Sequence, residues 1–178
     1  MKLPRERSRC GGRRYNEGMR SASRLVFLAL GVWGACFAQQ YDGPPPPKAD
    51  VPYLLHAENL IETEHQVAQE QMRKKEIAYI VTGERSPVKT PLAEPIFIIL
   101  AEKFPPQAYR LYKMEVVKGH RETAFPRKPG KRGPRPRYLT FDRVNDNVYK
   151  LEANEYLENG QYCLTPQGAN DVFCFEIY

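Results

Sequence analysis

The sequence is poor in the side chains on which most catalytic sites depend. Beyond residue 38 it contains one serine, Ser86, and three histidines, His56, His65 and His120. Ser86 stands in Gly-Glu-Arg-Ser-Pro rather than in a GxSxG elbow, so we expect a turn residue and no nucleophile. No GxGxxG, GxxxxGKS or GxxxxGKT segment is present, and we therefore predict no cofactor.

Metal-ligating side chains are also sparse, and they lack the spacing of known metal motifs. The densest group contains His56, Glu58, Glu62, Glu64 and His65. It matches neither HExxH nor a paired metal spacing, and on a strand Glu64 and His65 would point to opposite faces. We expect a solvated polar face here and no metal site.

Repeats, heptads and glycine-rich periods are absent. The 178 residues include 12 Gly and 16 Pro, and 42% of the chain is hydrophobic. This composition excludes collagen-like, coiled-coil and wholly disordered proteins. The length is sufficient for one domain with a buried core.

One long uncharged apolar run lies near the N-terminus, at residues 25–38, after two arginines. It is short for a membrane-spanning helix, which needs about 20 residues. A positive segment, an apolar segment and small residues at the end are typical of a secretory signal peptide. We predict that residues 1–38 are removed, that the mature chain starts at Gln39, and that Met19 is the initiator. An uncleaved signal anchor is the alternative.

Removal of this segment changes the charge of the protein. The full chain has 27 Lys and Arg against 21 Asp and Glu, a formal net charge of +6. Residues 1–38 hold eight of the basic and two of the acidic side chains, so the mature chain has 19 of each. Its net charge is zero. A nucleic-acid partner therefore loses its main support, and we expect none.

The mature chain opens with a proline-rich segment. Residues 39–50 read QQYDGPPPPKAD, and four consecutive prolines favour an extended polyproline II conformation. We expect a tether here, followed by a single β-rich domain over residues 51–178.

Short apolar segments separated by Gly, Pro and Asn turns predict a mainly β fold. We expect a compact antiparallel β-sandwich or small barrel with at most one short helix. The run at 96–100 is continuously apolar, as in a strand that is buried on both faces. A hairpin is expected within 111–125, closed by Lys118 and Gly119, where glycine adopts φ > 0. Two further strands are expected within 138–153.

The segment 51–83 can be interpreted in two ways. Residues 62–76 have high helix propensity, but they contain only two sizeable apolar side chains, so a helix would lack an apolar stripe for docking. The alternative is a long hairpin in which 53–63 forms one strand, 77–81 ends its partner, and the turn lies near 73–75. We prefer strands at both ends, with local helix between them as the alternative.

The last two strands are predicted to pair with Cys163 opposite Cys174. This register gathers Tyr162 and Leu164 on one face with apolar residues of the final strand, and leaves polar residues beside the cysteines. In an exported protein we then expect a Cys163–Cys174 disulfide, with two free thiols as the alternative. No CxxC is present, which excludes the usual thioredoxin-like motif.

One strongly basic segment remains in the mature chain, at residues 118–137, and Glu122 is its single acid. Four prolines and two glycines between 126 and 136 predict an extended loop. Because the mature chain is neutral, the loop at +7 is balanced by −7 elsewhere. Arginine suits phosphate or carboxylate partners. The candidate binding residues are the eight bases Lys118, Arg121, Arg127, Lys128, Lys131, Arg132, Arg135 and Arg137.

The preferred hypothesis is therefore a non-enzymatic, exported β-domain of the periplasm, the cell envelope or the medium. Through its basic loop it would bind an anionic envelope polymer or an acidic protein surface, or self-associate. A solvated loop without a partner is the alternative for this segment. Contact with a membrane is expected only through the signal peptide, because a membrane barrel would place Glu176 in its lipid-facing band. The alternative function is a hydrolase of cell-wall or glycan substrates that uses a carboxylate or His56.

Overall fold

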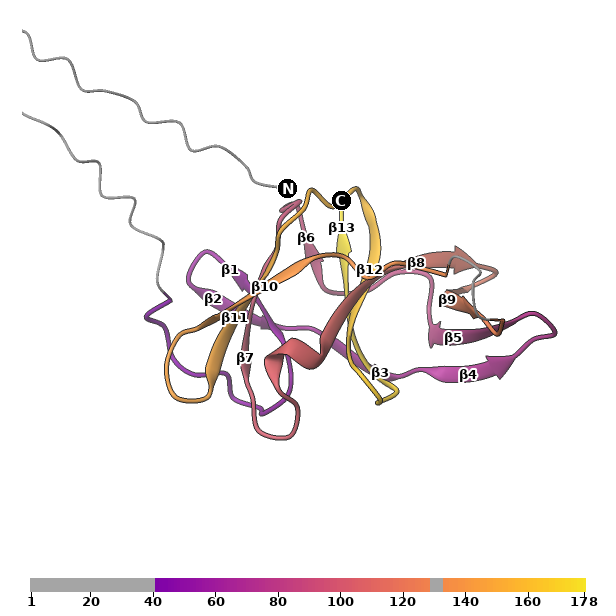
Figure 1. Ribbon diagram of the computed structural model, residues 1–178. Coiled ribbons are helices and arrows are strands. Elements are labelled where there is room, and N and C mark those ends of the chain that lie inside the picture. Colours follow the sequence, from indigo (N-terminus) through magenta and orange to yellow (C-terminus); the bar gives the residue numbers. More distant parts are fainter. Residues whose placement is uncertain (1–40, 129–132) are drawn as a thin grey trace, which may run out of the picture. The chain divides into compact units, whose positions relative to one another are not determined.

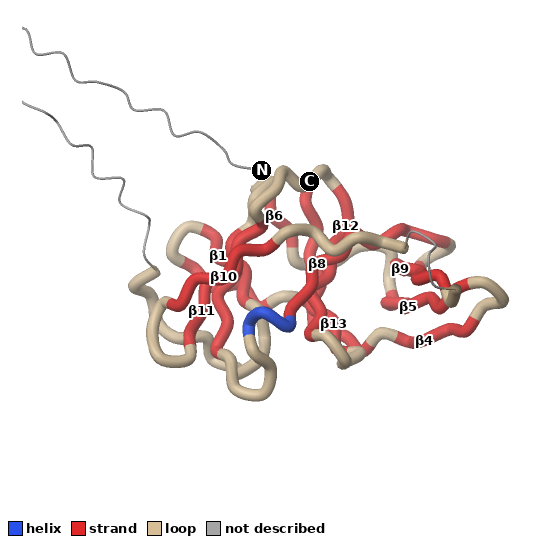
Figure 2. Tube along the Cα trace, viewed as in Figure 1, coloured by secondary structure: helices blue, strands red, loops and turns tan. Residues whose placement is uncertain are grey.

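The structure, a computed structural model, describes residues 41–128 and 133–178. Figure 1 shows that strands make up the fold, and all but one of the strand pairings within these ranges are antiparallel. Figure 2 shows a single short helical turn. That turn is the 3₁₀ helix η1 (Pro106–Ala108). The prediction of a mainly β fold with at most one short helix is confirmed. The predicted signal peptide and the start at Met19 lie outside the described residues.

Within the two described ranges, no helix has the length and apolar character needed to cross a membrane.

One layer of the fold is a five-stranded antiparallel sheet. In spatial order its strands are β10 (Leu139–Arg143), β11 (Val148–Ala153), β7 (Ile96–Leu100), β1 (Tyr53–His56) and β2 (Asn59–Glu62). The three middle residues of β7 are consecutive and fully buried. Since successive side chains of a strand point to opposite faces, both faces of β7 are covered, as predicted.

The second sheet is curled. In spatial order its main strands are β3 (Glu64–Val67), β13 (Asp171–Ile177), β12 (Gly160–Pro166), β8 (Tyr109–Val117), β9 (His120–Pro126), β5 (Glu76–Thr82) and β4 (Gln69–Met72), and β6 (Lys89–Thr90) pairs with β13. Only Ala68 separates β3 from β4, and its N–H donates to the carbonyl oxygen of Asn170 at 2.8 Å. The first and last strands of the sheet are therefore one continuous segment, which closes the sheet into a small antiparallel barrel.

Successive side chains of β8, β12 and β13 point to opposite faces of the sheet, and both faces of these strands are buried. One face packs against the five-stranded sheet and forms the sandwich core with Leu54, Phe97, Ile99, Tyr109, Leu111, Leu151, Tyr162, Leu164, Phe173, Phe175 and Ile177. The other face looks into the barrel, where Met114, Cys163, Val172 and Cys174 pack with Ala68 and Val81. The three strands are thus shared between a sandwich and a barrel.

The final hairpin has the predicted register and the predicted disulfide. Cys163 lies opposite Cys174, and the neighbouring pair is Tyr162 with Phe175. The two cysteines are bonded, with Cα atoms 4.0 Å apart. The expected side-chain sorting follows, because Tyr162 and Phe175 enter the sandwich core while the disulfide faces the barrel interior.

The hairpin of β8 and β9 also closes where it was expected. Lys118 has φ 45° and Gly119 has φ 88°. Positive φ at both central residues is the conformation that two-residue hairpin turns favour, and glycine adopts it without strain.

Two expectations for the segment 51–83 are wrong. The single strand expected at 53–63 is interrupted near Ala57, which has φ 53°, and β1 and β2 pair with each other as a hairpin. The alternative of local helix within 62–76 does not form. Instead β3 pairs with β13, and β4 pairs with β5 around the turn that was expected at 73–75.

The chain joins the fold before Val51. Pro46 is buried, and Ala49 forms a bridge with β7. The carboxylate of Asp50 accepts hydrogen bonds from three consecutive backbone N–H groups at 102–104, at 3.0 to 3.2 Å. The last residues of the predicted tether therefore belong to the domain.

Candidate functional site

The barrel interior is charged at the end where β9 begins. Arg121 is completely buried there and donates two hydrogen bonds to the Glu64 carboxylate, both at 2.8 Å. It also donates to the carbonyl oxygens of Gly83 and Thr82, at 2.9 and 3.0 Å. Burial disfavours the charged form of Glu64, but the hydrogen bonds from Arg121 and its neighbours outweigh burial and lower the pKa of that carboxyl. Arg121 is therefore inaccessible to a partner in solution.

A second polar network completes this closed end. The buried Ser86 N–H donates to Gln161 Oε1 at 2.9 Å, and its hydroxyl donates to the carbonyl oxygen of Cys174 at 3.2 Å. Glu176 is also buried and accepts hydrogen bonds from Arg85, which lower the pKa of its carboxyl. Gln161 and Glu176, two polar residues that the sequence placed on the face of the cysteines, are thus buried.

At its opposite end the barrel holds a cavity of about 550 Å³. This volume lies in the range of about 300–1,000 Å³ that is typical of small-molecule sites. One wall is formed by β5, β8 and β9, through Ile77, Tyr79, Tyr112, Met114 and Phe125. The other wall comes from the disulfide and the turn between β12 and β13.

The cavity exists because large and small side chains line opposite walls. Phe125 packs edge-on against Tyr79 and Tyr112, with ring centroids 5.8 and 5.3 Å away. The lining also includes Ala68, Gly168 and Ala169, which occupy little volume. In addition, β8 and β9 pair over only three residue pairs next to their turn, so the two strands diverge beside the cavity.

Arg110 is the one charged side chain that lines the cavity within the described chain. Its Nη1 group donates to the carbonyl oxygens of Gln107 and Tyr109, at 2.6 and 2.9 Å. Its Nε and Nη2 groups have no hydrogen-bond partner among residues 41–128 and 133–178. The half-buried guanidinium is therefore held in place with donors still available to a ligand.

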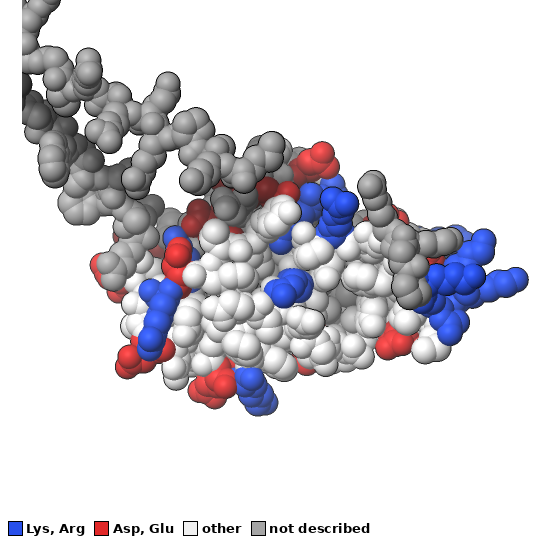
Figure 3. All heavy atoms as spheres, viewed as in Figure 1, with Lys and Arg blue, Asp and Glu red and all other residues white. Residues whose placement is uncertain are grey.

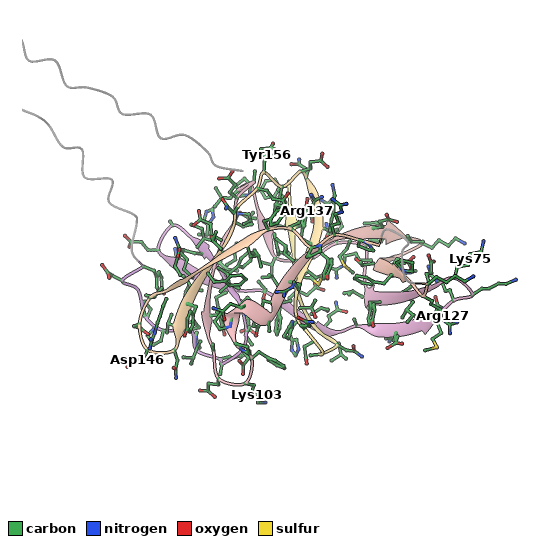
Figure 4. All side chains as sticks on the ribbon, viewed as in Figure 1. Lys75, Lys103, Arg127, Arg137, Asp146 and Tyr156 are labelled. Atoms are coloured by element: carbon green, nitrogen blue, oxygen red, sulfur yellow. A yellow bond between two sulfur atoms is a disulfide. The ribbon has the colours of Figure 1, made fainter. Side chains whose placement is uncertain are left out.

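Four exposed bases gather at the same end of the barrel. The N–H of Arg127 donates to the carbonyl oxygen of Lys75 at 3.0 Å, which extends the pairing of β5 and β9 by one step. This bond places the turn with Lys74 and Lys75 beside Arg127 and Lys128, and we call these four residues the basic tip. Figure 3 shows the cations gathered at this end, and Figure 4 labels two of them.

The basic tip is uncompensated and adjoins the cavity. None of its four side chains belongs to an ion pair formed within the described ranges. Pro126, which lines the cavity, precedes Arg127, and Ile77, which also lines it, follows Lys75 by two residues. Positive charge therefore flanks the open end of an apolar interior.

The structure divides the predicted basic loop at 118–137 into separate parts. Residues 120–126 are strand β9 rather than loop. Lys118 lies at the β8–β9 turn and is separated from Arg127 by the whole of β9, which spans about 20 Å. Arg121, between them, faces the barrel interior.

The remaining predicted bases do not form one surface either. Arg135 is exposed, whereas Arg137 lies 3.5 Å from the Glu155 carboxylate and bridges by its backbone to β8. Lys131 and Arg132 lie outside the described residues. Of the eight predicted binding residues, the structure thus brings Arg127 and Lys128 together at the tip.

Arg73 lies next to the tip in sequence, but its charge is neutralised. Its guanidinium donates to both oxygens of Glu122, at 2.8 and 2.6 Å, and His120 Nε2 lies 3.0 Å from the same carboxylate. The hydrogen bonds from Arg73 and His120 lower the pKa of Glu122 to about 2. This ion pair fastens the β4–β5 turn to the outer face of β9.

The histidines do not form a common site. His56 is exposed on β1, in the five-stranded sheet, whereas His65 is on β3, in the barrel. His65 stacks on Phe173 with ring centroids 5.0 Å apart and contacts Asp171 at 2.8 Å. Among the residues that the structure describes, no three metal-ligating side chains are close enough together to hold an ion.

Sequence reasoning missed Lys74, Lys75 and Arg110. The two lysines were expected near a turn, but only the pairing of β5 with β9 reveals that they adjoin Arg127. For Arg110 a signal was available, because it alternates with Tyr112 and Met114 along one strand and therefore shares their face.

The described structure thus presents a basic tip beside an apolar cavity. No protein-family model matches the chain, and neither a curated protein nor a solved structure matches it.

Proposed function

We propose that this chain is a non-enzymatic, exported binding domain whose basic tip attaches it to an anionic polymer of the cell envelope. The contact between Lys75 and Arg127 carries the proposal, because it concentrates four uncompensated cations on two adjoining loops. Clustered cations attract anions and bind several of their groups at once. Arginine adds two-pronged hydrogen bonding to phosphate or carboxylate.

The charge distribution of the rest of the chain supports this proposal. Arg73, Arg85 and Arg121 each have a carboxylate partner within the described fold. Since the chain beyond residue 38 has no net charge, the uncompensated tip is balanced by acids elsewhere, and local rather than global charge would select the partner. The Cys163–Cys174 disulfide is consistent with an oxidising compartment.

The test compares two double variants that remove the same charge. Arg127→Ser with Lys128→Ser alters the tip, whereas Lys103→Ser with Arg143→Ser alters exposed bases elsewhere. Figure 4 shows Lys103 and Asp146 away from Lys75 and Arg127. Arg143 lies 3.7 Å from the Asp146 carboxylate. Binding of polyphosphate and of polygalacturonate is measured at low and high salt, with neutral dextran as the control polymer.

We expect the tip variant to lose about tenfold in polyanion affinity at low salt, and we expect high salt to reduce the difference. The control variant should bind as the unmodified protein does. Equal losses in both variants, or binding that ignores salt, would contradict the proposal. The protein could instead bind neither polymer and form a salt-sensitive dimer that the tip variant does not form. That result would identify the partner of the tip as a second copy of this chain.

A further inference from the structure

We infer that the barrel cavity takes the hydrocarbon chain of an anionic amphiphile, with the anionic group at Arg110 and the adjoining basic tip. The inference rests on the proposed function in one respect, because the same end of the barrel supplies the positive charge. The cavity itself is independent of that proposal.

The walls of the cavity favour a hydrocarbon over a polar ligand. The buried residues Val81, Met114, Cys163 and Val172 line it, and so do aromatic rings carried by β5, β8 and β9. Burial raises the pKa of the Tyr112 hydroxyl, as expected of a wall that is shielded from water. A sugar or nucleotide of this size would need many more hydrogen-bonding partners.

Polar groups are confined mainly to one part of the lining. Thr165, Gln167 and Asn170 lie at the β12–β13 turn, and Arg110 lies near the start of β8. The opposite wall carries three hydroxyl groups, those of Thr123, Tyr79 and Tyr112. The Thr123 hydroxyl already contacts Met114 Sδ at 2.9 Å and the carbonyl oxygen of Lys113 at 3.2 Å, and the two tyrosine hydroxyls are carried on aromatic rings. A ligand that is apolar at one end and polar at the other fits this division.

The charge at the polar part selects an anion. Arg110 is held by two backbone carbonyl groups, and its remaining donors suit the two oxygens of a carboxylate or of a phosphate. A cationic amphiphile would meet repulsion from Arg110 and from the tip. The cavity volume of about 550 Å³ leaves room for one flexible hydrocarbon chain.

A chain-length series tests the inference on the purified protein. Calorimetric titrations would use acetate, hexanoate, octanoate, decanoate and laurate below their micelle concentrations, with lauryl maltoside as the uncharged amphiphile. Each pair of added methylene groups should raise the affinity about tenfold until the cavity is full. Lauryl maltoside should bind more weakly than laurate does.

Three variants locate the ligand. Ala68→Leu fills the cavity, and we expect it to lower laurate affinity about tenfold or more. Val172→Phe fills the same space from β13 and serves if the first variant fails to fold. The control is Val67→Leu, the exposed neighbour of Ala68, which should leave affinity unchanged. Arg110→Ser should reduce laurate binding about tenfold but leave lauryl maltoside binding unchanged.

The outcomes separate the inference from the proposed function. Affinity that is independent of chain length, or unaffected by both filling variants, would overturn the inference, while polyanion binding at the tip would stand. Equal affinities for laurate and lauryl maltoside, together with an unchanged laurate affinity in Arg110→Ser, would show that the ligand needs no anionic group. Chain-length-dependent binding without any polyanion binding would leave the inference standing and contradict the proposed function.

Discussion

The backbone N–H of Arg127 donates to the carbonyl oxygen of Lys75 at 3.0 Å, and this bond joins two basic loops that lie far apart in the sequence. It is the last step of the pairing between β5 and β9. The strands that bring these bases together also form one wall of the cavity. The charge and the apolar space of the proposed site therefore depend on the same pairing.

The buried ion pair of Arg121 and Glu64 should be required for stability. We expect Arg121→Met to lower the free energy of unfolding by about 3 kcal/mol, because Glu64, whose side chain is 14% exposed, would lose its partner in a largely buried position. Urea unfolding followed by circular dichroism measures the change.

Two further variants isolate the ion pair from other effects. Replacing both partners, Arg121→Met with Glu64→Met, should cost less than the single substitution, because no buried charge is left unpaired. Arg143→Met, at an exposed base, should change stability by less than about 0.5 kcal/mol. A loss below about 1 kcal/mol for Arg121→Met would show that Glu64 finds water or another partner.

Acid should weaken the fold partly through Glu122. Its pKa is about 2 in the folded protein, against an ordinary value of 4.5, so the unfolded chain takes up the proton first. The stabilisation from this carboxylate is therefore complete above pH 4.5 and is lost as the pH falls from about 4.5 to about 2. Urea unfolding at a series of pH values measures the loss.

Glu122→Gln should flatten the pH dependence over that interval, and the stabilities of the variant and the unmodified protein should approach each other near pH 2. Glu115→Gln is the matched control, since Glu115 is exposed and lies directly opposite Glu122 on β8. Parallel curves for Glu122→Gln and the unmodified protein would show that Arg73 and His120 do not stabilise the ionised form.

The disulfide makes two measurable predictions. The segment 151–178 contains both cysteines and no Lys or Arg, so trypsin releases them in one peptide. Before reduction this peptide should be lighter by two hydrogen atoms and should resist alkylation. The double variant Cys163→Ala with Cys174→Ala should lower the free energy of unfolding by about 2–3 kcal/mol. Alkylation of both thiols without reduction would show that the bond is absent.

Export should leave a protein that starts at Gln39. Because Trp33 is the only tryptophan of the chain, the processed protein should show tyrosine but no tryptophan fluorescence. Intact mass and the emission spectrum of protein from an exporting host test this. A tryptophan emission with an intact mass that includes residues 19–38 would indicate an uncleaved anchor.

Local patterns were sufficient to predict the elements whose side chains separate cleanly by face. Cys163 and Cys174 were placed correctly because one register sorts the apolar residues of both strands. Lys118 and Gly119 were placed correctly because the flanking strands need a turn with positive φ. The turn at Ala57 was missed because alanine rarely adopts positive φ and therefore gives no signal.

The site depends on pairing between distant strands, and local patterns carry little information about it. The segment of β3 and β4 lacks an apolar pattern because it turns two residues inward, Ala68 between the strands and the ion-paired Glu64, whose side chain is 14% exposed. Arg121 was expected at the surface because its partner, Glu64, lies far away in the sequence. Only closure of the barrel places Glu64 opposite it. The pairing of β5 with β9 brings Lys75 to Arg127, which a count of charges along the sequence cannot reveal.

Binding of polyphosphate by the double variant Lys74→Ser with Lys75→Ser is the most direct measurement of whether two loops form one anion site. We expect about a tenfold loss at low salt, equal to that of Arg127→Ser with Lys128→Ser. Lys118→Ser, at the far end of β9, should bind as the unmodified protein does. Full binding by the Lys74 and Lys75 variant, together with weaker binding by Lys118→Ser, would contradict the two-loop tip.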